Sequence, residues 1–157
     1  MAIVISKFLL SLAYAMGAAA VPVATVGSTL FALQASEKAD GSTDPYAVLL
    51  SYPGPAPDEL DRVAEISVQV KGTGKTAAAA TDLVNQLYES LYQDNVVRHG
   101  WVIAGKITSG LAVIDDPGVS YEVRLVIPQQ TPGVTGRDER GRWNVTFNFD
   151  VRFQLAT

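Results

Sequence analysis

The chain has 157 residues and a mass of 16.7 kDa, which is the size of a single domain. It carries 12 Lys and Arg against 16 Asp and Glu, a formal net charge of −4, and it has no cysteine. This composition gives no basic footprint for tight nucleic-acid binding and excludes disulfides, thiolate nucleophiles and cysteine metal sites. A mildly acidic protein can still line a passage through which DNA slides, because like charges prevent sticking.

The first segment has two interpretations. Residues 8–36 contain no charged side chain, and Lys7 precedes an apolar run, as in a secretory signal with small residues for cleavage around 18–24. The alternative is an amphipathic helix over about residues 2–20, ended by Pro22, with one apolar face in the core. A membrane span fits poorly because Gly, Pro, Ser and Thr interrupt the segment. We expect the buried helix.

Alternation of apolar and polar residues predicts most of the strands. We expect strands at 26–35 (short or merely extended), 46–52, 65–71, 101–108, 119–128 and 142–155. The last is the most regular, since the thirteen residues from Trp143 to Leu155 alternate throughout, whereas strands usually have about 5–6 residues. Between them, loops are expected at 36–45 and at the proline-rich 53–57.

Apolar residues from Ala80 to Leu91 recur at helical spacing, which predicts a helix over about 76–93 with one face on the sheet. The side chains expected to pack together are Leu83, Leu87 and Leu91 from the helix and Phe147, Phe149 and Val151 from the last strand. We therefore predict a single α+β domain over residues 1–157. It should have an antiparallel sheet, long C-terminal strands and the helices packed on one face.

Several motifs suggest chemistry but are incomplete. Gly72-Thr73-Gly74-Lys75-Thr76 matches only the end of a phosphate-binding P-loop, because Gln69 occupies the position of the first glycine. A tight strand-to-helix turn with a threonine N-cap explains the same residues. His99 is the only histidine and is expected in a surface turn, and Asp115-Asp116-Pro117-Gly118 is typical of a turn. We predict no catalytic, cofactor or metal site, and hence no enzyme.

The connection from Gln129 to Arg142 is rich in glycine and charge. Five charges of both signs occupy six positions near its end: Arg137, Asp138, Glu139, Arg140 and Arg142. Such a loop is usually solvated and mobile. Mixed charges also suit pairing between identical subunits, and arginine can pair with carboxylates through two hydrogen bonds. We expect these five residues to contact a second subunit.

Local sequences in a fixed order resemble phage tail terminator proteins, in the branch often labelled minor capsid proteins. The resemblance rests on the N-terminal helix followed by Gly27-Ser28-Thr29-Leu30-Phe31, then Val48–Gly54, then Ile66–Gly72 with the helix end Leu87–Leu91, and finally Gly136–Trp143 before the strand N-V-T-F-N-F-D-V-R-F. The last piece is the most specific. The first 45 residues depart from the pattern, with a more apolar helix and a longer loop at 36–45.

The resemblance implies a ring, typically hexameric, that caps the tail tube, stops its polymerisation and offers a surface for head docking. The implied partners are copies of the chain, the tail tube protein and a head–tail connector, with genomic DNA passing through and no membrane. The resemblance also implies that the five charged residues at 137–140 and 142 contact either a second subunit or the tail tube. The implied location is the virion after assembly in the host cytoplasm, which the lack of cysteine fits. The alternatives are another head–tail completion protein, a secreted binding module with a signal peptide, and a small nucleotide-using enzyme built on Gly72–Thr76.

Overall fold

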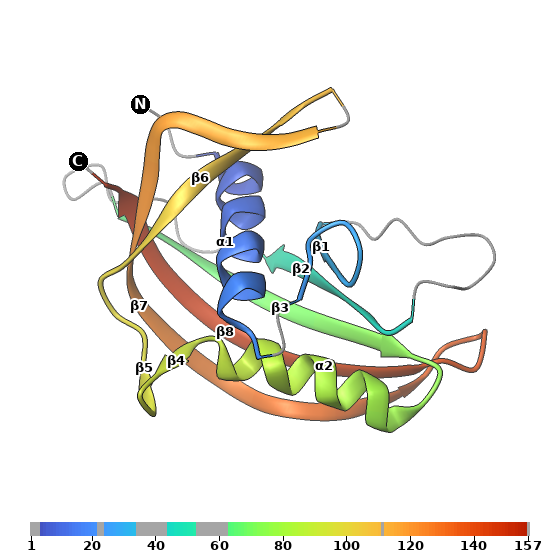
Figure 1. The fold of residues 1–157 in the computed structure, drawn as a ribbon. Helices are drawn as coiled ribbons and strands as arrows, with labels where there is room; N and C mark the ends of the chain where they lie inside the picture. Colours follow the sequence, from blue (N-terminus) through green and yellow to red (C-terminus); the bar gives the residue numbers. More distant parts are fainter. Residues whose placement is uncertain (1–3, 22–23, 34–43, 53–62, 111, 157) are drawn as a thin grey trace.

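A computed structural model describes residues 4–21, 24–33, 44–52, 63–110 and 112–156. The elements in chain order are α1 (Ile5–Ala19), β1 (Leu30–Ala32), β2 (Tyr46–Tyr52), β3 (Ala64–Gly74), α2 (Ala77–Glu89), β4 (Tyr92–Gln93), β5 (Val96–Val97), β6 (Trp101–Ser109), β7 (Ala112–Arg137) and β8 (Trp143–Leu155). Six strands form one curled sheet in the order β1-β2-β3-β8-β7-β6, and β4 and β5 form a separate hairpin (Figure 1). The α+β class is therefore confirmed.

The sheet is mixed, so the prediction of an antiparallel sheet holds for β3, β8 and β7 but is wrong for the pair β1 and β2. Strand β1 runs parallel to β2, with Leu30 opposite Ala47 and Ala32 opposite Leu49, while every other pair in the sheet is antiparallel. Parallel neighbours need a crossover connection of about a dozen residues, and the chain between Ala32 and Tyr46 is long enough to provide one. Alternation determines which face a side chain occupies but not the direction of the neighbouring strand.

The two longest strands bend together across the middle of the sheet. Residues 121–137 of β7 lie opposite residues 143–155 of β8, so seventeen residues face thirteen, and the four extra ones are absorbed at four register shifts. Each extra residue bends the strand and increases its twist. This explains the strong curvature of β7 and β8 in Figure 1.

Both helices lie on the concave face and complete one core. The ring of Phe8 in α1 stacks on Phe153 with a centroid separation of 3.5 Å, and Tyr88 in α2 meets Phe147 edge-on at 5.3 Å. Phe147 and Phe153 share one face of β8 because side chains alternate along a strand. The six residues predicted to pack together are all buried in this core.

The buried-helix interpretation of the N-terminus agrees with the structure. Phe8, Leu9, Leu12, Ala13 and Met16 of α1 have no exposed surface. A polar contact also fixes α1 to the edge strand β6, because the buried Ser11 hydroxyl donates to the Lys7 carbonyl and accepts from the Lys106 N–H. The helix covers residues 5–19, close to the expected range of 2–20, of which residues 2 and 3 lie outside the described part. In that part, no helix is long and apolar enough to cross a bilayer.

Three predicted boundaries were wrong. The connection expected over 129–142 is strand as far as Arg137, because β8 offers a long regular partner and the bulges accommodate Pro132, Gly133 and Gly136. The expected turn at 115–118 is also part of β7; Gly118 takes a φ of +73° in a four-residue irregularity opposite Gly105. The strand expected over 26–35 is reduced to β1, and residues 34–35, like the loops at 36–43 and 53–57, lie outside the described residues.

The central helix is shorter than predicted. It ends at Glu89 rather than near residue 93, and Tyr92 and Gln93 pair with Val97 and Val96 across a turn at Asp94 and Asn95. Its start agrees with the prediction, since the Thr76 hydroxyl caps the helix by accepting from the Ala79 N–H at 3.1 Å.

Glycines in β3 let α2 approach the sheet closely. A Cβ added at Gly72 would lie 2.2 Å from Cγ2 of Val84, and one at Gly74 would lie 3.2 Å from the Ala80 nitrogen. Only a residue without a side chain fits such a contact. Helix packing therefore explains the glycines of the incomplete P-loop motif.

Candidate interaction site

The charged turn between β7 and β8 lies at one end of the sheet. We refer to residues 137–142 as the tip. Arg137 pairs with Trp143 at the end of the β7–β8 ladder, and Trp143 pairs with Gly74 at the end of β3. The tip therefore lies beside the start of α2 and projects beyond the longest strands, as the red hairpin of Figure 1 shows.

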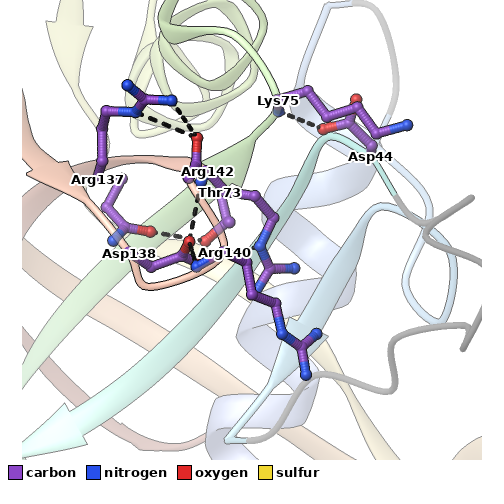
Figure 2. A network of polar contacts seen from close by, with 9 residues as sticks. Asp44, Thr73, Lys75, Arg137, Asp138, Arg140 and Arg142 are labelled. Atoms are coloured by element: carbon purple, nitrogen blue, oxygen red, sulfur yellow. Dashed lines mark hydrogen bonds and ion pairs between the residues drawn. The ribbon is translucent and has the colours of Figure 1, made fainter.

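Asp138 organises the tip from within (Figure 2). One carboxylate oxygen accepts from the N–H groups of Arg140 and Arg142, both at 2.9 Å, and the other accepts from Nε of Arg142 at 3.0 Å. The backbone adds bonds from the Asp138 N–H to the Arg142 carbonyl at 2.8 Å and from the Gly141 N–H to the Asp138 carbonyl at 3.0 Å. The tip is thus a closed, hydrogen-bonded turn.

These contacts stabilise the charged form of Asp138. The backbone N–H of Arg142 is the largest cause that lowers the pKa of Asp138, followed by the guanidinium of Arg142 and the N–H of Arg140; partial desolvation opposes them. Asp138 remains ionised over the physiological range. Its charge therefore helps to hold the turn.

Arg137 is also held within the tip. Its Nε and a terminal nitrogen donate to the Gly141 carbonyl at 3.2 and 3.1 Å, and its guanidinium lies 5.1 Å from the centre of the Trp143 ring. A left-handed conformation at Gly141, with φ of +76°, turns that carbonyl toward Arg137. The Arg142 guanidinium lies 5.8 Å from the Tyr46 ring at the start of β2, which anchors the other side of the tip to the sheet.

Three of the five charged residues are exposed, namely Arg137, Glu139 and Arg140, and the other two are partly buried. Figure 2 shows the guanidinium groups of Arg137 and Arg140 on opposite sides of the turn. The structure thus brings together all five residues predicted from the sequence.

A second feature lies along one side of α2. A groove of about 560 Å³ opens between the end of α1 and the exposed face of α2; we call it the helix groove. It is lined by Ala19, Val21, Asp82, Asn85, Gln86, Glu89 and Tyr92. The Tyr92 hydroxyl lies 3.0 Å from that of Tyr88, and this hydrogen bond, with burial, raises the pKa of Tyr92 to about 12. Asp82 and Glu89 therefore supply the negative charge of the lining.

A second hollow, of about 470 Å³, lies between α1, β1 and β6 and includes Lys7, Leu10, Leu33 and Lys106 in its lining. Lys106 forms an ion pair with Asp115 across the β6–β7 pair and lies 5.1 Å from the centre of the Tyr14 ring. These contacts fix its ammonium group at the strand edge.

Neither the partners that order the tip nor the helix groove could be predicted from the sequence. Trp143 and Tyr46 were assigned only to strands, although aromatic residues beside an arginine-rich turn are a signal for cation–π contacts. Asp82 and Glu89 are exposed on α2, as polar residues of an amphipathic helix usually are, but no sequence signal indicates that the end of α1 lies beside them.

The residues that suggested catalysis or nucleotide binding in the sequence do not come together in one site. His99 is exposed after β5, and Lys75 contacts Asp44 only through its backbone N–H, at 2.8 Å (Figure 2). Within the described ranges, no group of three or more His, Asp or Glu side chains is placed to hold a metal ion.

Comparison with protein-family models gives no match, and comparison with curated protein sequences gives none either.

Proposed function

We propose that this chain is a structural subunit that assembles with copies of itself into a ring, caps a phage tail tube and offers the surface on which a filled head docks. The ring ends tube polymerisation, contacts the tube protein and a head–tail connector, and lets genomic DNA pass through its centre. The order of local sequences that resembles tail terminators supports this proposal.

The observation that carries the proposal is the construction of the tip. It lies at the end of the two longest strands, and Asp138 and Arg137 hold it in one conformation before any partner arrives. A loop that only connects two strands in solvent does not need to be held in one conformation. A preformed charged projection suits a contact surface, because less conformational freedom is lost on binding.

The core position of α1 weighs against the alternative of a secreted module. A chain cleaved near residues 18–24 would lose five side chains of α1 that have no exposed surface, and the sheet would lose the aromatic stacking of Phe8 on Phe153. Mass spectrometry of the N-terminus of the protein isolated from its native source tests this alternative directly.

The decisive experiment measures the native mass and the effect on tubes. Native mass spectrometry should give a closed oligomer with a mass that is a whole multiple of 16.7 kDa, and electron microscopy should show the ring. Tail tubes assembled with the protein should have a fixed length, and tubes assembled without it should vary. The proposal would be refuted if the protein were a monomer at every concentration, or if tube lengths were the same with and without it.

A further inference from the structure

The six-stranded sheet has two edges, and each is partly covered by its own chain. β1 forms one edge, and on its outer side the Gly27 N–H donates to the Leu30 carbonyl at 2.8 Å. β6 forms the other edge, beside α1 (Figure 1), where the Ser11 hydroxyl accepts from the Lys106 N–H at 2.9 Å. Both covers occupy backbone groups that could otherwise pair with a strand of another chain.

The start of β6 has no such cover. The Ala156 N–H donates to the Ser120 carbonyl, so Ser120 directs its backbone groups away from β6. Ala104, its partner in β6, therefore directs its own N–H and carbonyl away from the sheet, and Val102 does the same because the direction alternates along an antiparallel strand. Within the described residues, no hydrogen bond is formed on this outer side at Val102 or Ala104.

This open stretch also lacks the features that normally prevent edge strands from pairing. The segment from Trp101 to Gly105 contains no charged residue and no proline. Val102 is 60% exposed, and Ala104 is exposed beside it on the same face. β7 differs, because its outer edge before Tyr121, where β8 has ended, carries two aspartates and a proline at 115–117.

The strand that fits this open edge is the same edge of a second copy. Among the described strands, β2, β3 and β8 are paired on both sides, and β4 and β5 have two residues each. An antiparallel pair centred on Ile103 places Val102 of each copy opposite Ala104 of the other, and each such pair exchanges both of its N–H···O bonds. The exposed Val102 thereby gains an apolar neighbour. A register shifted toward Lys106 would lose a bond, because Ser11 occupies that N–H.

We propose that β6 of one copy pairs antiparallel with β6 of a second copy through residues 102–104, which joins the two sheets about a two-fold axis. A contact between identical patches closes at two copies. The pairing goes beyond the proposed ring and does not rest on it, since it joins two chains whether each is alone or part of a ring.

Cysteine cross-linking tests the register, because the natural chain has no cysteine. On oxidation, a mixture of V102C and A104C should give a covalent dimer, since directly opposed residues lie about 5.5 Å apart between Cα atoms, within reach of a disulfide. Each variant alone should link far less, because identical positions are diagonal neighbours about 7–8 Å apart. V102C mixed with T108C is the matched control, with the second thiol at an exposed position of β6 outside the pairing, and it should give no dimer above the level of V102C alone.

A pair of charged variants provides the second readout. V102K/A104K places like charges opposite each other twice and should weaken the association of two copies at least about tenfold. V102E/A104K changes the same two exposed positions but places opposite charges across the axis, so it should associate at least about tenfold more tightly than V102K/A104K. Sedimentation velocity over a range of concentrations measures the association, and far-ultraviolet circular dichroism confirms that both variants are folded.

The outcomes separate this pairing from the proposed ring. Peptides that link residue 102 to residue 104 in the mixture, identified by mass spectrometry, support the pairing. The pairing is refuted if the mixture links no better than the T108C control, or if V102K/A104K associates like the natural protein. Rings that persist in V102K/A104K, while the natural protein gives the link, show that the ring uses another contact. A natural protein that gives the link but never exceeds a dimer supports the pairing and refutes the ring.

Discussion

The steric fit between β3 and α2 gives a quantitative prediction at Gly72. A Cβ at this position would lie 2.2 Å from Cγ2 of Val84 and 3.4 Å from the Ala80 carbonyl oxygen. Val84 has no exposed surface, so its side chain has no free space into which to rotate. We expect G72A to lower the free energy of unfolding by about 1–3 kcal/mol, the usual cost of overpacking a core.

A second substitution should relieve that strain. V84A removes two methyl groups, worth about 0.8 kcal/mol each, and leaves a small cavity, so alone it should cost about 2 kcal/mol. In G72A/V84A the new methyl occupies the space that Val84 vacated. The double variant should therefore cost less than the sum of the single ones by at least about 1 kcal/mol, since neighbouring sites couple by about 0.5–3 kcal/mol.

Urea denaturation at one fixed chain concentration measures all three variants, because assembly would otherwise shift the transition. G133A is the matched control: Gly133 is also a strand glycine, but a Cβ there would meet nothing within 4 Å. We expect G133A to change stability by less than about 0.5 kcal/mol or to raise it slightly. If G72A behaves like G133A, or if G72A and V84A are additive, helix packing does not explain the glycine, and the phosphate-loop hypothesis must be reopened.

Three further predictions concern the core, the incomplete P-loop and the tip. F149A should cost about 3–5 kcal/mol in urea denaturation because the ring is fully buried; a loss below 1 kcal/mol would show that this face is not core. K75A should leave stability and native mass unchanged, since the bond to Asp44 uses backbone; saturable ATP binding by calorimetry that the variant loses would contradict this. The lowered pKa of Asp138 means that its charge stabilises the fold fully above the ordinary pKa of 3.8, and that this contribution is lost as pH falls through the lower folded value. The stability difference between the natural protein and D138N should therefore shrink below pH 4 in urea titrations, and a difference independent of pH would contradict it.

The strands and the core could be predicted because their signals are local and repeated. From Trp143 to Leu155 every second residue is apolar, and β8 has those bounds with Val145 to Phe153 buried at alternate positions. The end of α2 was missed for a different reason. Leu91 keeps the helical spacing, but Asp94 and Asn95 take positive φ values of 52° and 64° and reverse the chain. The adjacent Asp-Asn pair was the available signal, because these residues tolerate the left-handed conformation.

The length of β7 could not be read from its own sequence. Pro132, Gly133 and Gly136 are residues that normally end a strand, and no alternation continues beyond Ile127. The partner strand overrides this local preference, because β8 presents a complete row of backbone groups that must be paired. The register shifts let β7 supply partners despite its extra residues. The length of β7 therefore depends on its pairing with β8 and cannot be predicted from the sequence of β7 alone.

Composition identified the five charged residues of the tip but could not assign their roles. Whether Asp138 faces a neighbour or its own chain depends on the conformation at Gly141, which brings the N–H groups of Arg140 and Arg142 to one carboxylate. Once Asp138 holds the turn, the exposed charges of the tip are those of Arg137, Glu139 and Arg140. Complementarity to a neighbouring copy then depends on where that copy places charges of opposite sign. A small preformed projection can bind a partner with few contacts, because the turn has little conformational entropy left to lose.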